Sequence, residues 1–173
     1  MTYGYDANVA NFIGVAGQNT VREHARNLIN ELAARRRSAA GRPIIFVAHS
    51  LGGLVCQDAL LICINPDEEA QSDILSSTSG IAFLGTPHAG SDLKKFAVAL
   101  ANIVSLSLKK PNKKLLKVLG RESEILANIK NDFMTMVRRH LENVQGTLKP
   151  IRLHTFTEEL PVDYLGYVSL CCA

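Results

Sequence analysis

The residues best suited to chemistry surround Ser50, in the run Val47-Ala48-His49-Ser50-Leu51-Gly52-Gly53. A serine between a buried strand and a helix occupies a tight turn that lifts its hydroxyl clear of the sheet. Small residues are needed two positions to either side, and Ala48 and Gly52 meet that need approximately and fully. The following helix directs its N-terminal N–H groups at the same point, so the N–H of Leu51 is a natural donor to an oxyanion. The pattern predicts a nucleophilic serine that attacks a carbonyl carbon.

Two other interpretations of the same residues are weaker. Ser50 could simply cap a helix in a glycine-rich turn, but its position directly after a five-residue apolar strand favours the nucleophile. Gly53 adds room for close packing of the helix. A phosphate-binding loop is disfavoured because no Lys-Ser or Lys-Thr pair follows the glycines.

A serine nucleophile needs a histidine as base and an acid that orients the histidine. Where the serine sits on a strand-to-helix turn of this kind, the chain order is serine, acid, histidine. The acid should follow a late strand. Glu158 and Glu159 both follow the strand expected at residues 151–156 and are the two candidates. No histidine follows Glu158.

The five histidines therefore need separate interpretations. His88 follows the strand expected at residues 80–84 and precedes the acid, so we expect Thr86-Pro87-His88 to shape the rim of the site. His49 adjoins the nucleophile but should point away from it across the turn. Two more, His24 and His140, are expected on helix surfaces, and His154 is expected to be packed or solvated within a strand.

Alternating elements are expected to position these residues. A strand-like start at residues 2–5 precedes a helix from a Thr20–Glu23 capping box to about Arg37. The apolar, β-branched run 44–48 suits a strand buried on both faces of a parallel sheet. Further segments are a helix to about Ile64, a strand at 80–84, helices at 92–108, 113–119 and 122–144, and a strand at 151–156. Strands that alternate with helices predict an α/β fold.

Four segments resemble, in order, a serine esterase and lipase-like family that includes the serine-active-site-containing proteins and many fungal relatives. They are Thr-Tyr-Gly-Tyr-Asp at 2–6, residues 47–53, residues 81–91 and residues 155–161. The resemblance implies an α/β-hydrolase fold and hydrolysis of ester bonds, often of lipids, without a cofactor. It also implies Glu158 as the acid and a catalytic histidine beyond a further strand.

The likeness is incomplete at both ends of the chain. The family's second oxyanion donor precedes the segment at residues 2–6, and the ending at residues 167–173 departs from the family's continuation. We therefore expect one partial domain over residues 1–173, truncated at both ends, within a larger multidomain protein. The alternative to an esterase is an inactive or incomplete hydrolase-fold module used for binding or sensing.

Composition limits the partners. The net charge is +3, aromatic residues make up 6%, and tryptophan is absent, which disfavours nucleic-acid binding. No apolar run reaches the ~20 residues of a membrane span. Lysines flank residues 96–108, so peripheral membrane contact is an alternative to a core-facing helix there.

The four cysteines suggest neither disulfides nor a metal site, and no signal peptide is evident. We expect an intracellular protein, cytoplasmic or associated with mitochondria or the endoplasmic reticulum.

Overall fold

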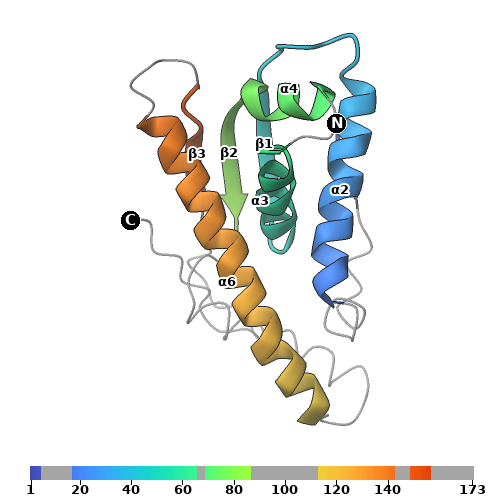
Figure 1. Ribbon diagram of the computed structural model, residues 1–173, viewed down its shortest axis with the longest axis vertical. Helices are drawn as coiled ribbons and strands as arrows, with labels where there is room; N and C mark the ends of the chain where they lie inside the picture. Colours follow the sequence, from blue (N-terminus) through green and yellow to red (C-terminus); the bar gives the residue numbers. More distant parts are fainter. Residues whose placement is uncertain (5–16, 66–68, 87–112, 143–148, 157–173) are drawn as a thin grey trace.

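The computed structural model describes residues 1–4, 17–65, 69–86, 113–142 and 149–156 (Figure 1). Helices and strands alternate along these residues, which confirms the α/β class. In chain order the elements are α2 (Gly17–Arg35), β1 (Ile44–His49), α3 (Gly52–Ile62), α4 (Glu69–Ser77), β2 (Thr78–Leu84), α6 (Lys113–Leu141) and β3 (Arg152–Phe156).

The three described strands form one parallel sheet in the order β1-β2-β3. Val47 lies beside Ala82 and Ala82 beside His154, so the strands stay in register across the sheet. Because the strands are parallel, all three end at the same edge. That edge is where Ser50 follows β1.

Helices cover one face of this sheet. Figure 1 shows α6, α3 and α2 side by side along the strands. Helix α3 is central to this layer, and every residue from Gly53 to Leu60 is buried. The main apolar members of the surrounding core are Ile29, Leu54, Leu60, Ile74, Ile81, Phe83, Phe133 and Ile151, each at most 1% exposed.

The prediction that β1 is buried on both faces is wrong for the described residues. Ile45 and Val47 are 71% and 72% exposed, whereas Ala48 is buried. Side chains alternate between the two faces of a strand, and the described helices cover the face with Ile44, Phe46 and Ala48. The apolar run reflects a strand that could be covered on both sides, but the described elements cover one.

Several predicted boundaries also differ. Helix α2 begins at Gly17, so Thr20 lies inside the helix and not at its N-cap as predicted. The two helices expected around Gly120 are one continuous helix, α6, because a single glycine costs a helix only about 1 kcal/mol. Helix α4 was not predicted. Residues 2–4 form no strand, and Tyr3 instead donates its hydroxyl to the carbonyl of His24 on α2, at 3.1 Å.

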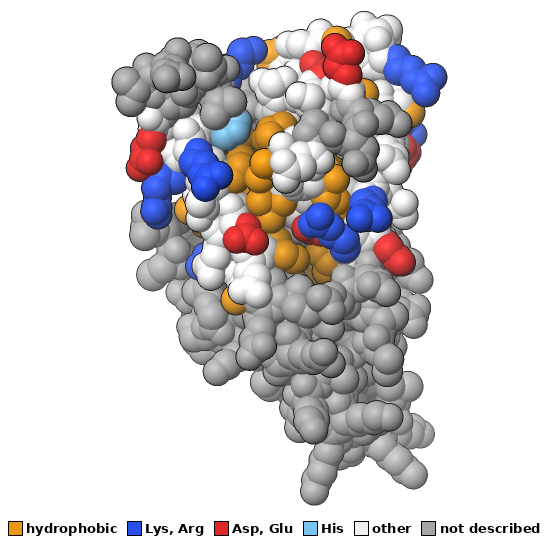
Figure 2. Space-filling view, viewed as in Figure 1, with side chains coloured by type: hydrophobic (Ala, Val, Ile, Leu, Met, Phe, Trp, Pro, Cys, Tyr) orange, Lys and Arg blue, Asp and Glu red, His pale blue; other side chains and the backbone are white. Residues whose placement is uncertain are grey.

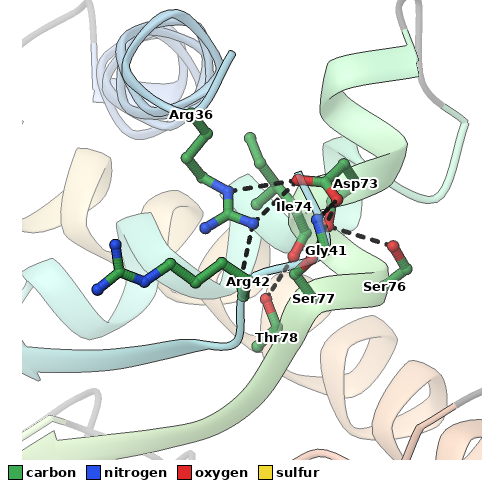
Figure 3. Close-up of polar contacts among 8 residues, drawn as sticks. All are labelled: Arg36, Gly41, Arg42, Asp73, Ile74, Ser76, Ser77 and Thr78. Atoms are coloured by element: carbon green, nitrogen blue, oxygen red, sulfur yellow. Dashed lines mark hydrogen bonds and ion pairs between the residues drawn. The ribbon is translucent and has the colours of Figure 1, made fainter. Parts of the chain in front are cut away.

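Asp73 on α4 joins that helix to the loop before β1 (Figure 3). Its Oδ2 accepts bonds from Arg36 Nη2 at 3.0 Å and Nε at 3.3 Å. Its Oδ1 accepts from the Gly41 N–H at 2.6 Å and from Ser77 Oγ at 3.1 Å. Burial of the carboxyl would by itself raise its pKa, but these donors outweigh burial and hold the pKa of Asp73 below its usual value.

Replacing Asp73 by asparagine is expected to lower the free energy of unfolding by about 1–3 kcal/mol at pH 7, because the charged acceptor is lost. A carboxyl whose folded pKa is depressed stabilises fully above its unfolded pKa, near 4, and loses that stabilisation as pH falls through the folded pKa. The gap between wild type and Asp73→Asn should therefore shrink below about pH 4.

Urea denaturation between pH 7 and pH 3 would measure this gap. Ser76→Ala is the matched control, because Ser76 is exposed and donates only to the backbone carbonyl of Asp73, at 3.2 Å. A gap that stays constant down to pH 3 would contradict a depressed pKa at Asp73.

The outer face of the helix layer carries a groove of about 770 Å³. Figure 2 shows hydrophobic side chains gathered in a hollow between α6 and α2, with charged side chains around it. Leu61, Ile129 and Met136 supply apolar lining, and Asp132 and Arg139 are among its charged residues. The groove contains none of the residues singled out for catalysis. No helix within the described ranges is long and apolar enough to cross a bilayer.

Candidate active site at the end of the first strand

Ser50 occupies the turn between β1 and α3 in a left-handed backbone conformation, with φ of 52°. It is the one non-glycine residue with positive φ among the described residues. A conformation of this kind costs roughly 1–3 kcal/mol for a residue with a side chain and persists only where the surrounding structure enforces it. At Ser50 the enforcing structure is a strand that ends one residue before and a helix that begins two residues after.

Hydrogen bonds hold this turn from both sides. The Ser50 N–H donates to the Leu84 carbonyl of β2 at 2.8 Å, and the Ser50 carbonyl accepts from the Gly53 N–H at 3.1 Å. The Leu51 carbonyl accepts from the N–H groups of Leu54 and Val55, at 3.0 and 3.2 Å. The turn is thus tied to the sheet by one bond and to the first turn of α3 by three.

Two N–H groups at the turn differ in availability. That of Ser50 is already bonded to β2. That of Leu51 has no acceptor among the described residues, although the Leu51 side chain is buried. At the N-terminus of a helix the first N–H groups are left without intrahelical partners. Within the described residues, the Leu51 N–H is thus left available to bind an anion or a polarised carbonyl oxygen.

Close packing between α3 and the end of β2 depends on Gly53. A methyl group on Gly53 would lie 2.2 Å from Oγ1 of Thr86 and 2.8 Å from its Cβ. Thr86 is fully buried, and its hydroxyl has no hydrogen-bond partner in the described part of the chain. The expected role of Gly53 in close helix packing is confirmed. Its partner, Thr86, was expected on the rim and is instead packed beneath the helix.

The ends of the three strands gather around this turn. Gly85, with φ of 57°, follows β2 and donates its N–H to the carbonyl of Phe156, the last residue of β3, at 3.0 Å. The predicted acid Glu158 comes two residues after Phe156, and His88 comes two residues after Thr86. Glu158, Glu159 and His88 lie outside the described residues, so their predicted roles stay predictions.

The described histidines are distributed as follows. His49 is exposed on β1, on the same side of the strand as Ile45 and Val47. His154 is exposed on β3. The prediction that His140 lies on a helix surface is wrong, because its side chain is only 7% exposed. Its Nδ1 lies 3.0 Å from the backbone carbonyl of Lys149, which returns to the end of α6 just before β3. No described residue hydrogen-bonds to the Ser50 hydroxyl.

The buried cysteines offer no competing nucleophile. Cys56 and Cys63 are 2% exposed and free, as expected for small buried hydrophobes. Burial raises the pKa of each thiol to about 12, so neither forms a thiolate near neutral pH. Among the described residues no cluster of histidine, cysteine and carboxylate side chains could hold a metal ion.

Comparison with known proteins points to one group of relatives. The chain is similar to Protein SERAC1. It is 30% identical over 139 residues to the proteins of that name from Bos taurus and Homo sapiens, which covers 79% of this chain and 18% of each relative. The Mus musculus protein is 31% identical over 111 residues, 63% of this chain. No family model and no solved structure matches.

The chain spans about 18% of the length of the first curated relatives that it matches. A segment of this size is consistent with one part of a larger multidomain protein.

Proposed function

We propose that residues 1–173 form one partial α/β-hydrolase domain, and that it is an esterase whose nucleophile is Ser50. Carboxylic esters, lipid esters among them, are the proposed substrates. The observation that carries the proposal is the left-handed backbone of Ser50 between a parallel strand and a helix. That conformation suits a serine whose hydroxyl must stand clear of the sheet. The similarity to Protein SERAC1 and the resemblance to the serine esterase family support the same reading.

Each neighbour then has a proposed task. The Ser50 oxygen attacks the ester carbonyl, and the Leu51 N–H donates to the oxyanion that forms. The Ser50 N–H cannot take that second task because it is bonded to Leu84. Glu158 orients the histidine that accepts the serine proton, and His49 and His88 belong to the rim. β3 ends at Phe156, at the same edge of the sheet as Ser50, and Glu158 comes two residues later in the sequence. This position supports the choice of Glu158 as the acid.

One observation favours a second candidate, a hydrolase-fold module without catalysis that binds or senses a ligand. The Ser50 hydroxyl has no base beside it among the described residues, and a serine without a base is a poor nucleophile. Loss of a triad member leaves residual catalysis but removes several powers of ten in rate.

Labelling with a fluorophosphonate probe separates the two candidates, because the probe reacts only with an activated serine. We expect the purified chain to be labelled and Ser50→Ala to lose labelling completely. Ser76→Ala, a change of the same kind at an exposed serine of α4, should be labelled like wild type. A chain that is folded by circular dichroism but unlabelled would establish the inactive module instead.

A further inference from the structure

The groove on the outer face of the helix layer, between α2 and α6, has an apolar floor that the described residues leave partly uncovered (Figure 2). Leu61, Leu75 and Ile129 are half-buried there, and Ile64 is 42% exposed. A concave apolar surface with a polar rim is typical of an interaction site. The groove is therefore a candidate surface for a partner.

Helix α6 forms one wall of the groove through a stripe of exposed polar residues, Asn128, Asp132, Thr135 and Arg139. They are separated by four, three and four positions, so they share one face of the helix. Asp132 and Arg139 are two turns apart, about 10 Å along the helix axis. Neither forms an ion pair with a described residue. This face thus carries one negative and one positive charge that the described part of the chain leaves unpaired.

The charges on this face are complementary to themselves. When two copies of α6 lie antiparallel around a twofold axis, Asp132 of each copy can face Arg139 of the other. The axis then passes near Thr135 and Met136, midway between the two charges, where uncharged side chains meet. One helix face therefore supplies both halves of two ion pairs.

The rest of the lining disfavours other classes of partner. Its charges are balanced, with Arg22 and Arg139 offset by Asp58 and Asp132, and Arg22 forms an ion pair with Asp58. An anionic membrane or a nucleic acid would be expected to meet an excess of basic residues. A helix suits the shape of the groove, because α2 and α6 lie along it on either side of α3 (Figure 1).

We propose that this groove is a homodimer interface, in which α6 of a second copy lies antiparallel to α6 in the space between α6 and α2. Two Asp132–Arg139 pairs set the register, and Ile64 and Ile129 contribute apolar contact. The inference goes beyond the proposed esterase and does not depend on the reactivity of Ser50.

Sedimentation velocity of the purified full chain, from about 1 to 100 μM, tests the proposal. We expect wild type to dimerise within this range. Asp132→Arg and Arg139→Asp should each raise the dissociation constant at least about tenfold, because the twofold axis turns one substitution into two like-charge contacts. Both side chains are exposed, so each variant should keep the circular dichroism spectrum of wild type.

A mixture of the two variants tests the register itself. In a heterodimer of Asp132→Arg with Arg139→Asp, both contacts again join opposite charges, so the mixture should dimerise although neither variant does so alone. The double variant Asp132→Arg/Arg139→Asp should dimerise for the same reason. Arg138→Asp and Asn131→Arg are matched controls at neighbouring exposed residues that do not line the groove, and they should leave dimerisation unchanged.

Three results would overturn the proposal. A chain that stays monomeric over the whole concentration range would show that the groove does not accept a second copy. Dimerisation that neither charge reversal weakens would place the interface on another surface. Loss of dimerisation in each variant without recovery in the mixture would exclude the antiparallel pairing of Asp132 with Arg139.

Discussion

Phe133→Ala is expected to lower the free energy of unfolding by about 3–5 kcal/mol, a large effect for a single substitution. Phe133 on α6 is fully buried and meets Phe83 of β2 edge to face, with ring centroids 6.1 Å apart and planes at 88°. Truncation removes the aromatic contact and leaves a cavity between the long helix and the central strand. Urea denaturation would measure the loss.

Two further variants define the cause of this loss. Phe133→Leu keeps most of the side-chain volume and should cost less than half as much as alanine. Met134→Ala alters the next residue of the helix, which is 40% exposed, and should change stability by no more than about 0.5 kcal/mol. A small effect of Phe133→Ala would mean that α6 is not anchored to the sheet through this ring.

Gly53→Ala is expected to destabilise the protein by about 1–3 kcal/mol, because the added methyl would overlap Thr86. Oγ1 and Cγ2 of Thr86 would lie 2.2 and 2.3 Å from it, and the fully buried Thr86 has little room to move. The start of α3 must then shift away from β2. If Ser50 is the nucleophile, its fluorophosphonate labelling should fall as well, since the turn is tied to both elements.

A double-mutant cycle tests the contact itself. Thr86→Ala removes Oγ1 and Cγ2 and leaves only the Cβ at 2.8 Å, so it should recover part of the loss caused by Gly53→Ala. Gly80→Ala is the matched control: this buried glycine of β2 would place its methyl 3.4 Å from the Arg152 carbonyl, an ordinary contact. Additive effects of the two changes at Gly53 and Thr86 would rule out the overlap as the cause.

The elements nearest the candidate site were predictable because their signals are local. The apolar segments 44–48 and 80–84 became β1 and β2, since each is about five residues long, which suits a buried strand better than a helix. The position of Ser50 between strand and helix followed directly. The prediction at Thr20 failed because a capping box describes only neighbours in sequence, and helix α2 extends one turn further back to Gly17.

Contacts between distant segments could not be derived in the same way. Nothing local to Thr86 indicates that it packs beneath Gly53, 33 positions earlier, because that contact exists only once β2 lies beside β1. His140 has the sequence environment of an exposed helix residue, yet the return of the chain at Lys149 buries it. The exposure of Ile45 likewise reflects which face of the sheet the helices cover.

The sequence by itself determined the alternation of strands and helices and the location of Ser50 in the turn after β1, because hydrophobic period and glycine placement act over a few residues. Only the tertiary structure decided the left-handed backbone of Ser50 and the hydrogen bond that occupies its N–H. Each of these depends on Leu84 lying beside β1, and the pairing of two strands is a property of the folded sheet rather than of either segment.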